Sequence, residues 1–163
     1  TGTVFFFFFR RRTTGKPTRE TDPVPARIRG RLDEFVALRF MYMLHAAAGN
    51  QAAAAIVGQI DSLATNVTEL FVRLKTRSDK AQRGRALEEY DDKLGTVIAA
   101  LGREYLLDVV ANPALWEEPE QRIRGVQAAI QAVDGQVVDN IRQVNARQGM
   151  VFQVALSEIG GLR

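Results

Sequence analysis

The chain has 163 residues, of which 46% are hydrophobic and 25% are charged, and its formal net charge is +3. This length and composition fit one globular domain with a core of its own. The chain has no Cys, and His45 is its single His, so it lacks the residues for a thiolate zinc site, a disulfide framework, a Cys nucleophile or a multi-histidine metal cage. We therefore expect neither a metal nor another cofactor.

The positive charge is concentrated near the N-terminus. Residues 1–31 hold eight Arg or Lys against two acidic residues, a net charge of +6, whereas the other 132 residues carry a net charge of −3. A domain that binds nucleic acid over its whole surface would spread its positive charge more widely. The distribution therefore disfavours a nucleic-acid partner. It indicates that any contact with anionic groups is made by the N-terminal arm.

Residues 1–9 contain five consecutive Phe, Phe5–Phe9, placed directly before Arg10, Arg11 and Arg12. So short an apolar run cannot cross a bilayer, which takes about 20 residues. Aromatic residues followed by Arg are nevertheless typical of the cytoplasmic end of a transmembrane helix. We expect residues 1–9 to be the stub of a transmembrane segment at the inner membrane. A cloning remnant and a buried apolar strand are the alternatives.

Residues 10–25 predict a juxtamembrane linker, extended or disordered, because Pro17, Pro23 and Pro25 oppose a regular helix. Anionic lipid attracts each Lys or Arg near a membrane surface by about 1 kcal/mol. We therefore expect residues 10–31 to contact an anionic membrane surface, with simple topological charge as the alternative. The membrane-proximal basic residues are Arg10, Arg11, Arg12, Lys16 and Arg19.

Residues 26–160 have helical periodicity throughout and predict an all-α domain, an antiparallel four-helix bundle with long helices. The first helix, about Val24–Ala48, becomes apolar nearly all round toward its end, and Gly49 and Asn50 end it. The second has the most regular stripe, in which apolar residues alternate in steps of four and three: Ile56, Ile60, Leu63, Val67, Leu70 and Leu74. A turn is expected within residues 75–85.

The third helix is expected to run through Val109 and to end at Asn112–Pro113, since a residue before proline avoids the helical region. The fourth begins near Pro119 and reaches about Ile159. Its apolar stripe is expected to include Val151. A helix of about 40 residues is longer than a compact bundle needs. We expect it either to bend near Gly149 or to project and pair with another copy.

No constellation in the sequence predicts catalysis, so we expect no enzyme and no catalytic, cofactor-binding or metal-binding residue. His45 is expected to pack or to cap the first helix. Glu88, Glu89, Asp91 and Asp92 form the densest acidic cluster, which we interpret as a solvated face, with a docking patch for a basic partner as the alternative. The candidate partner-binding residues are Trp116, Glu88, Glu89, Asp91, Asp92, Asn140 and Asn145. Trp116 is expected to staple the following helix or to anchor an interface.

Part of the third and fourth helices resembles the XpaC-like group of bacterial proteins. The resemblance is carried by Tyr90-x-x-Lys93-Leu94, by Pro119-Glu120-x-Arg122-Ile123-x-x-Val126-x-x-Ala129-Ile130-x-x-Val133, and by the aliphatic residues from Met150 to Leu156. It implies a bacterial, membrane-associated, all-helical protein, and it implies no catalytic residue.

These observations predict a membrane-tethered cytoplasmic domain that works by protein–protein interaction, as a receptor, adaptor or scaffold. The partners expected are other proteins and, through the last helix, a second copy of the chain. A structural or accessory subunit of a larger membrane complex is the first alternative. A hydrolase that uses the carboxylates of residues 88–92 is a less favoured one.

Overall fold

The computed structural model describes residues 22–161, and within that range the chain is all-α. Its elements are α2 (Ala26–Ala47), α3 (Gln51–Arg77), α4 (Lys80–Leu101), α5 (Leu106–Ala111), the 3-10 helix η1 (Pro113–Leu115) and α6 (Pro119–Gly161). The predicted all-α class is confirmed. The predicted transmembrane stub and most of the predicted linker lie outside the described residues.

The turn between α2 and α3 uses the residues that the sequence indicated. Gly49 has a φ of +97°, a left-handed conformation that glycine adopts without a steric penalty. The side chain of Asn50 then accepts a 3.0 Å hydrogen bond from the amide of Ala53 and caps α3. The helical break expected at these two residues is confirmed.

The turn between α3 and α4 is equally short. Ser78 is the C-cap of α3, and Asp79 is the N-cap of α4. The Asp79 side chain accepts a 2.8 Å hydrogen bond from the amide of Gln82. The Gln82 side chain in turn accepts a hydrogen bond from the amide of Asp79, which completes a capping box. Such a reciprocal cap fixes where α4 begins, and it lies inside the range predicted for this turn.

The third predicted helix is interrupted. The structure ends α4 at Leu101 and starts the separate short helix α5 at Leu106, so the expectation of one helix through Val109 is wrong. The chain changes direction between the two helices. Leu106 and Val109 of α5 are nevertheless buried in the same core as α4, which explains why the apolar pattern continues across the break. The expected stop at Pro113 is confirmed, since α5 ends two residues earlier.

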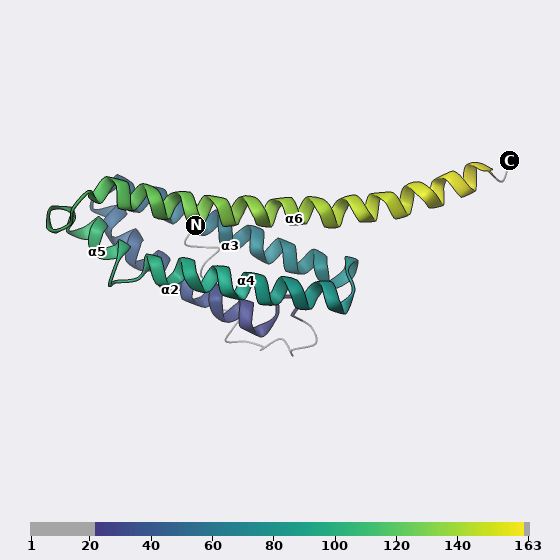
Figure 1. The fold of residues 1–163 in the computed structure, drawn as a ribbon, viewed down its shortest axis with the longest axis horizontal. Helices are drawn as coiled ribbons and strands as arrows, with labels where there is room; N and C mark the ends of the chain where they lie inside the picture. The colour runs from purple at the N-terminus through teal and green to yellow at the C-terminus, as the bar shows by residue number, and fades with distance from the viewer. Residues whose placement is uncertain (1–21, 162–163) are drawn as a thin grey trace.

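Helices α2, α3, α6 and α4 surround one core in that spatial order (Figure 1). Helices that follow one another in the chain run antiparallel, as expected. The contacts of α3 with α6 and of α2 with α4, however, join helices that run in the same direction. Hydrogen bonds confirm this direction for α3 and α6, because Gln59 pairs with Gln127 and, seven residues further along both helices, Asn66 pairs with Asp134. The bundle therefore differs from one in which all neighbours are antiparallel.

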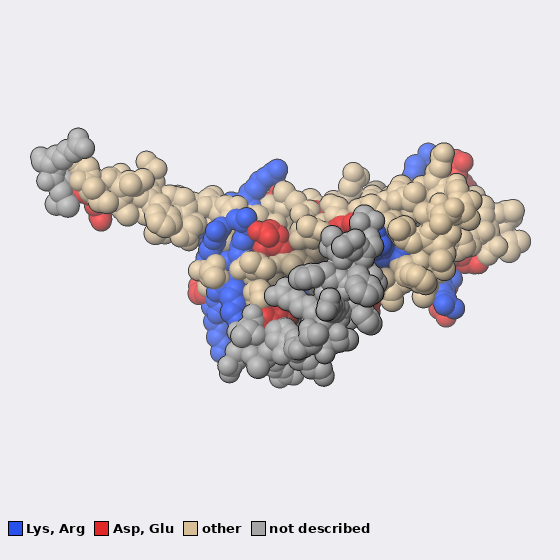
Figure 2. Space-filling model, turned by 180° about the vertical axis from the view of Figure 1, so that it is seen from behind, with Lys and Arg blue, Asp and Glu red and all other residues tan. Residues whose placement is uncertain are grey.

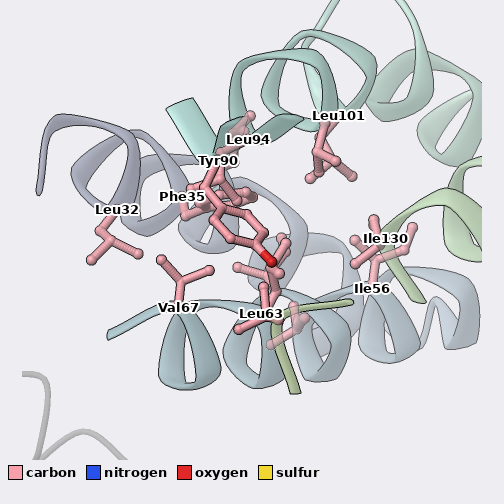
Figure 3. Close-up of a cluster of buried hydrophobic side chains, with 14 of the residues drawn as sticks. Leu32, Phe35, Ile56, Leu63, Val67, Tyr90, Leu94, Leu101 and Ile130 are labelled. Carbon is pink, nitrogen blue, oxygen red and sulfur yellow. The ribbon is translucent and has the colours of Figure 1, made fainter. Parts of the chain in front are cut away.

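The core is built from the predicted stripes. Figure 3 shows Leu32 of α2 beside Val67 of α3, and Ile56 of α3 beside Ile130 of α6, while α4 contributes Tyr90, Leu94 and Leu101. The six residues of the α3 stripe, Ile56, Ile60, Leu63, Val67, Leu70 and Leu74, are at most 5% exposed. Burial of each such side chain stabilises the fold by about 1.5–3 kcal/mol.

Helix α6 has 43 residues and extends well beyond the other helices (Figure 1). Val144 is the last residue of α6 in the core, at 9% exposed. Val151 is 64% exposed, so its predicted place in the core stripe is wrong. The reason is that α3 ends at Arg77 and α4 begins at Lys80, and neither reaches this part of α6. The structure shows that the end of this helix projects, and its pairing with another copy stays a prediction.

Candidate interaction surfaces

The acidic cluster on α4 is paired with Arg residues of α2. Arg27 donates to Glu88 Oε1 and to Asp91 Oδ2, both at 2.6 Å. Arg31 donates through Nε to Asp91 Oδ1 at 3.0 Å. The bond from Arg27, followed by that from Arg31, lowers the pKa of the Asp91 carboxyl below its usual value. Two of the four acidic candidates thus hold α2 and α4 together.

Space for the Arg31 side chain comes from a glycine on α4. A Cβ atom added at Gly95 would lie 2.8 Å from Nη2 of Arg31. A larger residue at this position would require the flexible end of the Arg31 side chain to move. The guanidinium of Arg31 therefore lies close to the backbone of Gly95, an approach that the sequence pattern alone did not indicate.

The other two acidic residues of the cluster differ from each other. Glu89 accepts hydrogen bonds from Lys93, at 2.9 Å, and from the amide of Gln136 on α6, at 2.6 Å. Asp92 is exposed. Three of the four carboxylates therefore bond to other side chains of the bundle. Within the described residues, only the Asp92 side chain agrees with the predicted solvated face.

Three of the basic residues that the sequence placed near the membrane, Arg27, Arg29 and Arg31, lie in the helical domain. Arg29 pairs with Asp22 at 3.1 Å, in addition to the pairs that Arg27 and Arg31 make with α4. These three Arg residues are part of α2. The predicted basic residues Arg10, Arg11, Arg12, Lys16 and Arg19 lie outside the described residues.

The two candidate Asn residues attach α6 to its neighbours. The Asn140 amide donates a hydrogen bond to the hydroxyl of Tyr90 on α4. Asn145 Oδ1 accepts hydrogen bonds from Arg73 and from Arg77 of α3, each at 2.8 Å. Polar groups beside an apolar stripe can fix the register of packed helices. Both residues therefore act within the bundle, at the point where α6 leaves it.

Trp116 lies in the connection between η1 and α6 and packs inside the chain. Its indole Nε1 donates a 2.8 Å hydrogen bond to Asp108. The ring meets Tyr105 edge-on, with centroids 5.8 Å apart, and the Arg122 guanidinium lies 5.5 Å from its centroid. Asn112 and Trp116, through their hydrogen bonds, lower the pKa of Asp108 below its usual value. The contact with Arg122 joins Trp116 to the following helix, as a staple would, whereas the contacts with Asp108 and Tyr105 join it to the segment before that helix.

A long, nearly uncharged surface lies on the C-terminal extension of α6, by which we mean residues 146–160. Figure 2 shows it as a nearly uncharged arm beside a gathering of Lys and Arg at the end of the bundle. Its large apolar side chains are between 59% and 69% exposed: Met150, Val151, Phe152, Val154, Leu156 and Ile159. No residue of the extension was among the candidate partner-binding residues. The available signal was its charge content, because only Arg147 and Glu158 are charged among these residues.

A second apolar surface lies on the last turns of α2. Phe40, Met43 and Leu44 are 64%, 39% and 59% exposed, and their spacing places them on one helix face. We call these three residues the α2 patch. This is the helix end that the sequence predicted to be apolar nearly all round. His45 is next to the patch in the last turn and is partly buried, and its backbone carbonyl accepts hydrogen bonds from the amides of Ala48 and Asn50.

Neither metal chemistry nor a membrane span is indicated by residues 22–161. In that range no three His, Cys, Asp or Glu side chains are close enough together to bind a metal ion. None of the helices described there is both long enough and apolar enough to cross a membrane.

A shallow pocket between α3, α4 and α6 is lined by Arg85, Asn140 and Arg147 among others.

No family model, no curated protein and no solved structure matches this chain. The resemblance to XpaC-like proteins, which depends on residues of α4 and α6, therefore stays a prediction.

Proposed function

We propose that this chain is a membrane-tethered, cytoplasmic helical domain that works by binding another protein, as an adaptor, receptor or scaffold, through the C-terminal extension of α6. The observation that carries the proposal is the exposure of six large apolar side chains on one projecting helix. Contiguous apolar patches on soluble monomers are usually limited to a few hundred Å², and larger ones mark interaction sites. The extension is about 22 Å long at the standard helical rise.

The extension has the spacing that a groove-binding helix needs. Phe152, Leu156 and Ile159 follow one another by four and three residues and share one face. Partner grooves recognise helices through anchors at these intervals. We therefore assign the face formed by Phe152, Leu156 and Ile159, which we call the anchor face, to the partner protein.

The tether is supported by the sequence of the arm. The apolar run Phe5–Phe9 stands directly before Arg10, Arg11 and Arg12, which is the order expected at a cytoplasmic membrane boundary. A tether of this kind raises the local concentration of the domain near membrane proteins, so that an anchor face of modest affinity suffices.

Site-specific photocrosslinking tests the interaction. A photoreactive residue at Leu156, on the anchor face, is compared with one at Gln131, which is exposed on the part of α6 that packs in the bundle. In cells that produce the chain natively, we expect a discrete adduct with a second protein from position 156 alone. The adduct should disappear when Ile159 is replaced by Asp. If position 156 attaches no protein other than the chain itself, the proposal is wrong.

The α2 patch favours the second candidate, a subunit of a larger membrane complex. In that case Phe40, Met43 and Leu44 would be covered by a neighbouring subunit. A photoreactive residue at Leu44 separates the two functions. An adduct from position 44 without one from position 156 supports the subunit, and the reverse supports the interaction module.

A further inference from the structure

The two charged residues of the extension have opposite signs and lie on one face. Arg147 and Glu158 are eleven residues apart, which is about three helical turns. Val151 and Val154 lie between them on the same face. The four residues follow one another in steps of four, three and four, the spacing of a coiled-coil seam. We call Arg147, Val151, Val154 and Glu158 the seam.

The seam continues a stripe that is buried inside the bundle. The same alternation of four and three residues runs through Val126, Ile130, Val133, Val137, Asn140 and Val144. Of these, Ile130 and Val137 are at most 1% exposed. Val151 and Val154 are 64% and 59% exposed. The periodicity that packs α6 against the bundle therefore persists on the part of α6 that α3 and α4 do not reach.

We propose that a second copy of this chain covers the seam, with the two extensions antiparallel. In this register Arg147 of each copy lies opposite Glu158 of the other, and Val151 lies opposite Val154. One two-fold axis then creates two ion pairs and a central apolar contact at once. A parallel pair in register would instead place Arg147 beside Arg147 and Glu158 beside Glu158, which is destabilising.

The same register fits the length of the extension. The midpoint between Arg147 and Glu158 falls between residues 152 and 153, close to the middle of residues 146–160. Pairing about that point places residues 146–159 of the two copies side by side, so the paired segment begins directly after Val144 and Asn145, where α6 leaves the bundle. The register selected by charge therefore also uses nearly the whole extension.

The end of the bundle adds to the charge complementarity. Glu158 of the second copy arrives beside Arg147, close to where Arg73 and Arg77 hold Asn145. Figure 2 shows that Lys and Arg gather at this end of the bundle. An acidic residue near the tip of the extension therefore meets positive charge on the other copy.

Self-association uses a different face from the proposed partner. The anchor face, Phe152, Leu156 and Ile159, adjoins the seam and is left uncovered by the pair. This inference accordingly adds a second copy to the proposed interaction module and does not depend on the identity of its partner. Either one can fail while the other holds.

Charge exchange tests the seam by sedimentation equilibrium of the full chain. We expect the wild type to be dimeric, and we expect Arg147→Glu alone or Glu158→Arg alone to raise the dissociation constant at least about tenfold, since each change opposes like charges twice. The double variant Arg147→Glu/Glu158→Arg should restore the dimer. An equimolar mixture of the two single variants should form a heterodimer, because each opposed pair again has opposite charges. Far-UV circular dichroism should show the same helix content in all variants.

Cysteine trapping tests the antiparallel direction, since the natural chain has no Cys. When Val151→Cys and Val154→Cys chains are mixed and oxidised, we expect the mixed disulfide to exceed either homodisulfide. A monomeric wild type at about 100 µM overturns the proposal, and so does a dimer that both charge reversals leave unchanged. Because the basic arm is itself expected to bind anionic lipid, the lipid test compares the wild type with Val151→Asp on phosphatidylglycerol vesicles. Binding that this change removes, without any dimer of the wild type, would assign the seam to a lipid surface and would also overturn the proposal.

Discussion

The hydroxyl of Tyr42 on α2 donates a 2.7 Å hydrogen bond to the backbone carbonyl of Leu101, the last residue of α4. Tyr42 is fully buried, at 0% exposed. The bond gives a partner to one of the carbonyl groups that the end of a helix leaves without an intrahelical donor. It therefore holds the end of α4 against α2 at the point where the chain turns toward α5.

Replacing Tyr42 with Phe should lower the free energy of unfolding by about 1–3 kcal/mol, because the carbonyl of Leu101 would stay buried without its donor. Urea denaturation followed by circular dichroism measures the change. Tyr105→Phe is the matched control, because Tyr105 is partly buried and its ring packs on Trp116. We expect the control to change stability by less than about 0.5 kcal/mol. Equal losses in the two variants would contradict the role given to the Tyr42 hydroxyl.

Alkaline solution should destabilise the bundle through its two buried tyrosines. Burial raises the pKa of Tyr42 and of Tyr90 above the usual value of 10. The unfolded chain ionises these groups at about pH 10, while the folded chain holds them neutral. The contribution of these two groups to the free energy of unfolding should therefore be constant below about pH 9, and the free energy should fall as the pH rises beyond about 10. In Tyr42→Phe the decrease should be smaller, as unfolding titrations at several pH values would show.

The carboxylate of Asp91 should contribute stability that acid removes. Its pKa is lowered in the folded chain by Arg27 and Arg31, so the contribution is present above about pH 4 and is lost as the pH falls through the folded pKa. At neutral pH, Asp91→Asn should lower the midpoint of thermal unfolding by about 2–4 °C. Asp92→Asn, at the exposed neighbouring position, should leave it unchanged. Identical melting of all three chains would show that the ion pairs contribute nothing.

Truncation to Ala should affect the free energy of unfolding at only one of two isoleucines on α6. Ile130 is 1% exposed and lies in the core, so Ile130→Ala should lower the free energy of unfolding by about 2–5 kcal/mol. Ile159 is 65% exposed on the anchor face, and Ile159→Ala should leave that energy unchanged. Chemical denaturation at low protein concentration makes the comparison. A large loss in Ile159→Ala would mean that the extension packs on the chain itself.

The apolar spacing correctly predicted which residues are buried wherever another helix packs on the apolar stripe. Leu63 and Leu70 lie in the regular stripe of α3, and helices surround that stripe along its whole length, so periodicity and burial coincide. Val151 shows the limit of this inference. Its spacing is that of a core residue, but burial also requires another helix at the same height, and the lengths of α3 and α4 do not follow from the pattern of α6.

The contacts of the candidate site residues were harder to predict for a similar reason. Asn145 was correctly singled out as a polar residue beside an apolar stripe, but its partners Arg73 and Arg77 come from a helix about 70 residues earlier in the chain. Arg27 was assigned to the membrane-proximal arm because charge was counted along the sequence. The parallel placement of α2 and α4 brings it to Glu88 and Asp91 instead. Local charge patterns contain no information about which helices become neighbours.

The parallel pairing of α3 with α6 also has a consequence for how the chain acquires its structure. The hydrogen bonds between these helices join residues 68 to 72 positions apart, as in the contacts of Ser62 and Asn66 with Asp134. The hairpin of α2 and α3, in contrast, closes over a few residues at Gly49 and Asn50. Since distant contacts require a larger loss of chain entropy before they form, docking of α6 is expected to be the slow step of folding. On a ribosome, the first three helices would emerge before the helix that completes their core.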